Sequence, residues 1–197
     1  MINLIKYKFL GKNPIFEIYF RNKKSLDIGC GQGEFIANDC NLISGIDLNE
    51  RVVRQLQEKN FNVKFASATK IPYNNNEFEA VHCKNIIEHL FPEEARNMIS
   101  EISRVLKNDG VLVLQTPSEH VVWSTFGHVK PYTPTAVRKL FRDKSLESFE
   151  GVSGLRMEKV VYLGKLNGRL GFIFSTFLAQ FFGIFCGNYI MIIRKYA

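Results

Sequence analysis

The sequence predicts a doubly wound α/β domain, in which a mostly parallel sheet of seven strands carries helices on both faces. Three observations lead to this prediction. Short apolar runs alternate with segments of helical periodicity, which is the order expected for strand–helix–strand units. A glycine-rich turn at residues 29–33 directly follows the first apolar run. The 197 residues contain no internal repeat and no linker rich in proline, glycine or serine, so we expect one domain over residues 1–197.

The expected elements follow one another in a regular order. Seven apolar runs are predicted as strands, at residues 25–28, 42–48, 62–68, 78–84, 111–116, 157–164 and 189–194. Four stretches are predicted as helices, at residues 33–40, 50–59, 92 up to the turn at 108–110, and 134–141. Two of these helices begin with proline, and Asn49 and Thr133 stand as N-cap residues before two of them. In such sheets ligands bind beyond the carboxyl ends of the strands, so we expect the site there.

The composition is that of a globular protein with an excess of positive charge. Apolar residues make up 46% and charged residues 23% of the chain, and the formal net charge is +7. A basic surface attracts nucleic acid, anionic lipid or an acidic substrate. No nucleic-acid-binding motif accompanies the charge, so no nucleic-acid partner is expected. The four cysteines lack C-x-x-C spacing, which argues against a disulfide framework or a zinc site and indicates a reducing cytosol; no metal is predicted.

The glycine turn is the clearest functional signal in the sequence. Glycines at positions 29, 31 and 33 permit a tight turn at which a ligand can touch the backbone. A dinucleotide fingerprint would place its third glycine at position 34, where this chain has Glu34, whose carboxylate would repel a pyrophosphate. Asp47 ends the second strand, at the place of the ribose-binding acid in nucleotide-binding folds. The alternative is that Asp47 caps the helix that follows.

These segments together resemble the class I S-adenosylmethionine (SAM)-dependent methyltransferases, in particular the group that includes the quinone-biosynthesis methyltransferases. The resemblance covers about residues 25–141. It is carried, in order, by Leu26-Asp-Ile-Gly-Cys-Gly-Gln-Gly33, Gly45-Ile-Asp-Leu48, Ala66-Ser-Ala68, Phe78-Glu-Ala-Val-His-Cys-Lys-Asn-Ile-Ile-Glu-His-Leu90 and Ile102-Ser-Arg-Val-Leu-Lys-Asn-Asp-Gly-Val-Leu-Val-Leu114. The resemblance implies a Rossmann-like methyltransferase fold with an antiparallel last strand, SAM as the cofactor and S-adenosylhomocysteine as the product.

The resemblance also implies which residues contact the cofactor. The glycine turn would hold the methionine part of SAM, and the acid at position 47 the ribose. Ser67 and Ala68 would flank the adenine, and Cys83 and Lys84 would lie beside the sulfonium and amino group. The full expected set is Asp27, Gly29, Cys30, Gly31, Gly33, Asp47, Leu48, Ser67, Ala68, Cys83 and Lys84. The family usually has an acid where Ser67 stands, and a neutral hydroxyl is expected to bind the adenine amino group more weakly.

The acceptor is expected to meet side chains that follow the fourth and fifth strands. SAM carries its own activation, so the protein mainly aligns the acceptor and excludes water, and a general base is needed only for a protonated acceptor. His128 and His89 are the catalytic candidates, and Glu88 and His120 are further candidates on the same side of the sheet. The alternative for His89 is structural packing, and for His128 it is anchoring of its loop.

Residues 170–193 contain no charged side chain, and a stretch of this length is long enough to span a membrane. If 189–194 form the last strand, the apolar part shortens to 170–186, which is too short for a span. We therefore expect an apolar insert at 168–187 before the last strand. Three roles remain open for it: a helix on a membrane surface, a cover over a lipid or prenylated acceptor, and a core or homodimer-interface helix. The basic, aromatic segment 1–24 is expected to act as a lid over the cofactor-binding core at 25–141.

The sequence thus predicts a SAM-dependent methyltransferase with a small-molecule or lipid-linked acceptor, methylated at oxygen by in-line displacement. The expected location is cytoplasmic, with a peripheral position at the inner face of the membrane if residues 170–186 contact lipid. Two other functions stay open. One is a nucleotide-dependent oxidoreductase, against which Glu34 argues. The other is a non-catalytic SAM- or nucleotide-binding scaffold of the same fold.

Overall fold

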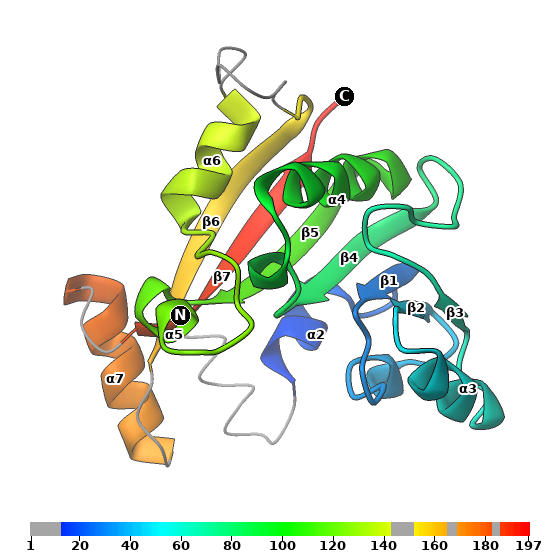
Figure 1. The fold of residues 1–197 in the computed structure, drawn as a ribbon, viewed down its shortest axis with the longest axis horizontal. Helices are drawn as coiled ribbons and strands as arrows, with labels where there is room; N and C mark the ends of the chain where they lie inside the picture. The colour runs from blue at the N-terminus through cyan, green and yellow to red at the C-terminus, as the bar shows by residue number, and fades with distance from the viewer. Residues whose placement is uncertain (1–12, 143–151, 165–168, 183–185) are drawn as a thin grey trace.

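A computed structural model describes residues 13–142, 152–164, 169–182 and 186–197 (Figure 1). Seven strands form one sheet in the order β3-β2-β1-β4-β5-β7-β6. Their bounds are β1 Ser25–Ile28, β2 Ile43–Asp47, β3 Val63–Phe65, β4 Phe78–Lys84, β5 Leu106–Pro117, β6 Leu155–Gly164 and β7 Cys186–Lys195. The first five strands pair in parallel, whereas β7 runs antiparallel to both β5 and β6. The predicted fold class is confirmed, including the antiparallel last strand.

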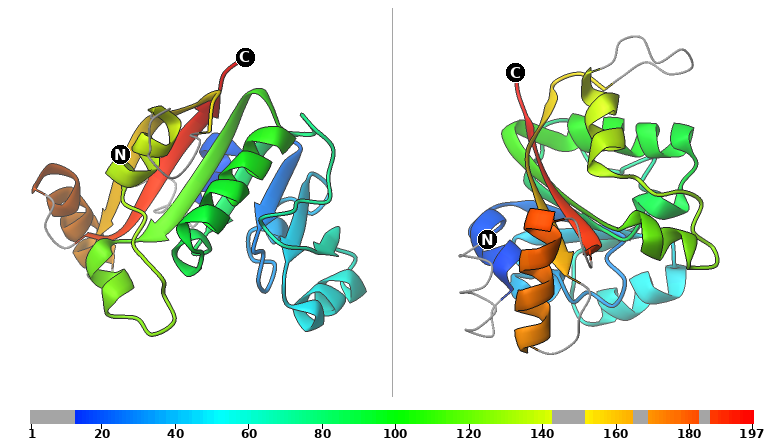
Figure 2. Two further views of the ribbon diagram at one scale, coloured as in Figure 1. Left: turned by 45° about the horizontal axis from the view of Figure 1, so that its top comes forward. Right: turned by 90° about the vertical axis from the view of Figure 1, so that its left-hand side faces the viewer.

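Helices cover both faces of the sheet, and a separate apolar core lies on each face. On one face α4 (Pro92–Val105) and α6 (Pro134–Arg142) pack on the strands, and α2 (Pro14–Tyr19) lies on the opposite face with α3 (Glu50–Glu58) (Figures 1 and 2). Leu112 and Leu114 belong to the first core, and Val111 and Val113 to the second. Alternate side chains of a strand point to opposite faces, so a strand buried on both sides is apolar throughout.

The prediction of a helix at 33–40 is wrong. Only a 3₁₀ turn forms there, at Ile36–Asn38. The side-chain amide of Asn38 donates hydrogen bonds to the carbonyls of Phe35 (2.8 Å) and Glu34 (3.3 Å). These carbonyls would otherwise accept the N–H groups of the next helical turn, so the side chain competes with the helix. A second difference is that α4 ends at Val105 and β5 begins at Leu106, five residues before the predicted start.

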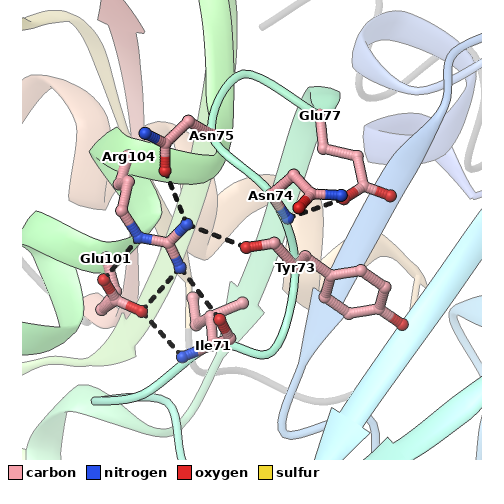
Figure 3. A network of polar contacts seen from close by, with 7 residues as sticks. All are labelled: Ile71, Tyr73, Asn74, Asn75, Glu77, Glu101 and Arg104. Carbon is pink, nitrogen blue, oxygen red and sulfur yellow. Dashed lines mark hydrogen bonds and ion pairs between the residues drawn. The ribbon is translucent and has the colours of Figure 1, made fainter.

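A network around Arg104 of α4 fixes the long connection between β3 and β4 (Figure 3). The guanidinium donates to the carbonyls of Tyr73 (2.8 Å) and Ile71 (2.9 Å) and to Asn75 Oδ1 (2.9 Å), and it forms an ion pair with Glu101. Glu101 in turn accepts a hydrogen bond from the Ile71 N–H (2.8 Å). The Arg104 hydrogen bond lowers the pKa of Glu101. One helix thereby orders the connection that carries the predicted adenine-side residues.

Helix α7 (Arg169–Phe182) packs along β6, the strand at one edge of the sheet (Figure 1). Two α7 side chains accept hydrogen bonds from the free side of β6: Thr176 Oγ1 from the Gly164 N–H (2.9 Å) and Gln180 Oε1 from the Tyr162 N–H (3.2 Å). A Cβ on Gly164 would lie 2.0 Å from Ser175 Oγ and 2.3 Å from the Thr176 nitrogen. Glycine is therefore required for the helix to approach the strand this closely.

The predicted apolar insert corresponds to α7, whose outer face is aromatic. Phe174, Phe177 and Phe181 recur at helical spacing and are exposed. In the part of the chain that the structure describes, no helix is both long and apolar enough to cross a membrane. Contact of residues 170–186 with a membrane surface, an acceptor or a second copy stays a prediction.

Candidate functional site

A pocket of about 460 Å³ opens at the carboxyl ends of β1, β4 and β5. Five of the predicted cofactor residues line it: Asp27, Gly29, Cys30, Gly31 and Lys84. Gln115 of β5 contributes from the adjacent strand, and Asn13 and Ile15 contribute from the start of α2. This is the edge of the sheet at which doubly wound folds bind their ligands.

The glycine turn has the backbone conformation that the sequence predicts. Gly29, Gly31 and Gly33 all have positive φ angles, of +68°, +49° and +80°. A Cβ on Gly29 would lie only 2.1 Å from Ile86 Cδ1, whereas a Cβ on Gly31 would meet no atom within 4 Å. Glycine at position 29 is therefore favoured by its positive φ and because a Cβ would displace the Ile86 side chain, whereas Gly31 leaves its backbone open to the pocket.

Asp47 connects the glycine turn to the end of β2. Its Oδ2 accepts a hydrogen bond from the Gly31 N–H (2.9 Å), and its Oδ1 accepts one from the Asn49 N–H (2.8 Å). Asn49 itself is the N-cap of α3, since its Oδ1 accepts from the Val52 N–H. Asp47 is thus placed beside the turn instead of capping the helix, and its contact with a ribose stays a prediction.

A buried pair of Asp27 and His82 forms the floor of the pocket, and sequence reasoning missed its second member. Asp27 Oδ1 and His82 Nδ1 lie 2.7 Å apart, and the His82 ring stacks on Phe35 with ring centroids 3.8 Å apart. Burial raises the pKa of Asp27, and the hydrogen bond with His82 opposes this shift. The sequence offered one signal: His82 is the only charged or strongly polar side chain among the buried residues of β4, and it pairs in register with Asp27 of β1.

Both cysteines of the predicted set have buried side chains. Cys83 of β4 is buried in the core and is not part of the pocket lining. Burial raises the pKa of Cys30 to about 12, which keeps its thiol protonated. Cys30 is therefore a space-filling residue beside the turn, and not a nucleophile.

The remaining predicted residues lie away from the pocket lining. Gly33 packs under Leu56, Ala68 is buried, and Leu48 is exposed. Ser67 Oγ accepts a hydrogen bond from the Thr69 N–H (3.1 Å) and lies 2.8 Å from Thr69 Oγ1. The hydroxyl expected at the adenine is thus already part of a local turn.

The structure brings three of the four acceptor-side candidates together. Glu88, His89 and His128 each offer one oxygen or nitrogen atom, and these atoms lie within 4.8 Å of one another. A hydrogen bond from the Val129 N–H to the Glu88 carbonyl (2.8 Å) holds the two segments side by side. Burial raises the pKa of Glu88. The fourth candidate, His120, lies exposed on α5 (Glu119–Trp123) and is not part of this cluster.

The sheet order, the glycine turn and the pocket define a doubly wound α/β domain with an open pocket at the carboxyl edge, where such folds bind their ligands. Comparison with known sequences makes the class specific. Residues 26–114, somewhat less than half of the chain, match the family described as a methyltransferase domain. This match supports the predicted SAM-dependent methyltransferase class, with SAM as its cofactor, for this part of the chain.

Individual relatives are similar to part of this chain. An uncharacterized protein of Methanocaldococcus jannaschii is 35% identical over 100 residues, which is 48% of this chain and 42% of that protein. An uncharacterized methyltransferase of Synechocystis is 28% identical over 112 residues, 51% of each chain. This chain therefore matches about half or less of the length of these relatives.

A solved SAM-dependent methyltransferase from Archaeoglobus fulgidus has the same fold as this chain. The two superpose with a TM-score of 0.69 at 21% identity, covering 98% of both chains. The similarity extends through the C-terminal strands, beyond the segment that matches the family. The narrower resemblance to quinone-biosynthesis enzymes stays a prediction.

Proposed function

We propose that this chain transfers the methyl group of SAM to a small-molecule or lipid-linked acceptor that binds beyond β4 and β5. The observation that carries the proposal is the pocket between the glycine turn and the ends of these strands. Its charges suit SAM, because Asp27 and Glu34 offer carboxylates to the cationic sulfur and amino group, and Lys84 offers a cation to the carboxylate.

When bound, SAM supplies a methyl group on a positively charged sulfur that leaves as a neutral thioether. The chain has to orient the two reactants and exclude water from them. Asp27, whose carboxylate is hydrogen-bonded to His82, forms a fixed floor of the pocket, and the backbone of Gly31 forms one wall. The start of α2 lies over the same pocket through Asn13 and Ile15, which supports a covering role for the N-terminal segment.

The acceptor would meet His89 and His128, the side chains that we propose act on it. For a hydroxyl acceptor, the oxygen bonds to the methyl carbon, the carbon–sulfur bond breaks, and sulfur keeps the electron pair. The acceptor proton is then released to a base or to water. Oxygen as the target atom rests on these two imidazoles, whose ring centroids lie 4.8 Å apart.

The test combines binding with turnover. Calorimetry with SAM and S-adenosylhomocysteine is expected to show one site per chain, and titration with NADH is expected to show none because Glu34 faces the pocket. Release of S-adenosylhomocysteine is then measured after addition of aqueous and organic fractions of a cell extract. His128→Gln should bind SAM normally and lose this release, whereas exposed His120→Gln should retain it.

Failure to bind SAM or its product at millimolar concentration would contradict the proposal. Binding without turnover on any fraction would instead favour a non-catalytic scaffold of the same fold.

A further inference from the structure

The cluster of Glu88, His89 and His128 contains polar atoms that the protein leaves without partners. Glu88 is fully buried, and only one of its carboxylate oxygens, Oε2, has a partner, the Thr116 hydroxyl at 3.2 Å. Within the described part of the chain, Glu88 Oε1 and His128 Nδ1 are buried with no hydrogen-bond partner. Unpartnered buried groups of this kind are costly and rare, so they call for a missing ligand.

The third member of the cluster is held in the form that a metal ligand requires. His89 Nδ1 lies 3.3 Å from the carbonyl oxygen of Gly127, and a carbonyl can only accept. The Nδ1 proton therefore points to the backbone and leaves the Nε2 lone pair free. Histidines that bind metals usually donate their other N–H to a carbonyl or carboxylate in this way.

One carboxylate and two imidazoles form a common donor set for zinc and related ions. His₂Glu sites hold Zn²⁺ in catalytic proteins and leave one position open for water or substrate. Ligand atoms about 2.1 Å from one ion are at most about 4.2 Å apart. The present limit of 4.8 Å thus requires only small side-chain rotations, which exposed His89 and half-buried His128 can make.

We propose that Glu88, His89 and His128 bind one divalent transition-metal ion, with Zn²⁺ the best suited by its ligands. The ion would satisfy the free oxygen of Glu88 and the free nitrogen of His128, and it would compensate the buried negative charge. The cysteine spacing gave no indication of a zinc site, because these ligands come from segments that are adjacent only in the fold.

The site lies next to the cofactor pocket along two strands. Thr116, which contacts Glu88, follows pocket-lining Gln115, and Asn85 of the same lining precedes Glu88 by three residues. This consequence rests on the proposed function: the open position would bind a hydroxyl oxygen of the acceptor and lower its pKa. The bound hydroxyl would lose its proton to water, its oxygen would bond to the methyl carbon, and the carbon–sulfur bond would break with sulfur keeping the electron pair, so the acceptor class is an alcohol or phenol.

The test measures metal binding apart from activity. The full chain is stripped with EDTA, and Zn²⁺ binding is measured by equilibrium dialysis with elemental analysis. Co²⁺ is used as a spectroscopic probe, because its ligand-field bands report nitrogen and oxygen ligands and its charge-transfer bands report thiolates. We expect one equivalent of Zn²⁺ per chain and a Co²⁺ spectrum without thiolate bands, also in Cys40→Ser, which removes the exposed thiol.

Variants then locate the ion. His89→Gln, His128→Gln and Glu88→Gln should each weaken Zn²⁺ binding at least tenfold, by analogy with the ~10–100-fold effects of altering metal-site surroundings. The exposed control His120→Gln should bind Zn²⁺ like the parent chain. Calorimetry with SAM on every variant monitors the fold and the cofactor site, and the two histidine variants remain informative if Glu88→Gln fails to fold.

The outcomes separate the two proposals. Absence of Zn²⁺ binding, binding lost in Cys40→Ser, or binding unchanged in both histidine variants would overturn the metal site. Normal SAM binding in that case would leave the proposed function intact. Zn²⁺ bound through these residues in a chain that does not bind SAM would support the metal site and contradict the methyltransferase function.

Discussion

The part of the sheet that carries the glycine turn and the part that carries the histidine cluster are built in different ways. β1 to β4 are parallel strands of three to seven residues, and the turn after β1 has three glycines with positive φ angles. The histidine cluster instead lies beyond the ends of β4 and β5, where Glu88 and His89 follow β4 and His128 comes from the segment after α5. In the first part the functional groups are largely backbone groups within a few residues of one another. In the second part they are side chains that only the folded chain brings together.

The largest expected effect tests the backbone-based part at Gly29. Gly29→Val puts a β-branched residue at a φ of +68° and a Cβ against Ile86. Strain and overpacking together should lower the free energy of unfolding by about 2–6 kcal/mol. Denaturant unfolding measures this loss. Gly31→Ala is the matched control, with open space around its Cβ, and should cost about 1–2 kcal/mol. Equal losses in the two variants would contradict the assigned roles.

A second effect concerns Arg104, which holds the β3–β4 connection on α4. Arg104→Met removes several charge-assisted hydrogen bonds and should lower the free energy of unfolding by about 1.5–3 kcal/mol. Arg54→Met removes an exposed ion pair with Glu50 and should cost at most about 0.5 kcal/mol. A loss at Arg104 no greater than at Arg54 would show that the connection is not held by this network.

The same network predicts a dependence of stability on pH. Arg104 lowers the pKa of Glu101 in the folded state from its ordinary value of 4.5. The stabilisation is therefore complete above pH 4.5 and is lost as pH falls through the lower folded-state pKa. Unfolding curves below pH 4.5 should show this decrease in the parent chain and a smaller one in Arg104→Met. Parallel curves for the two proteins would argue against the coupling.

Asp47 gives a smaller but more specific test of the cofactor-binding part. Asp47→Ala removes a carboxylate that holds Gly31 and that we expect to hold the ribose, so SAM affinity should fall more than tenfold. Asn49→Ala removes the cap of α3 and should cost about 1 kcal/mol of stability with little change in affinity. Calorimetry and unfolding on both variants separate ligand binding from helix capping. Unchanged SAM affinity in Asp47→Ala would exclude the ribose role.

The smallest effect is expected on the outer face of α7. Phe174→Gln and Phe181→Gln alter side chains that are about 60% exposed, so stability should change by no more than about 0.5 kcal/mol. Unfolding is followed at several protein concentrations, because association of two copies through this face would make stability depend on concentration. A loss above 1 kcal/mol that grows with concentration would identify α7 as a homodimer contact.

Sequence reasoning succeeded for local geometry that depends on neighbouring residues. The glycine turn and Asp47 were found because their spacing follows from one strand–turn–helix unit and the next strand. The partner of Asp27 was missed, since His82 lies 55 residues away and meets it only through strand register. Glu88, His89 and His128 were each predicted as candidates, but their proximity depends on a loop contact made by Val129. The helix at 33–40 failed because a side-chain hydrogen bond outweighed the apolar pattern.

The contact between α7 and β6 has a consequence for how the molecule behaves in a crowded solution. A terminal strand of ten residues with free N–H groups is a template on which another chain can add a strand, and such pairing leads to aggregation. Gln180 and Thr176 occupy two of these donors, and the close approach at Gly164 places a helix along the edge. The opposite end of the sheet, β3, has only three residues and offers little to pair with. Helix α7 thus protects the long edge strand from pairing with another chain. Its exposed aromatic face offers no free strand to pair with, because it is helical.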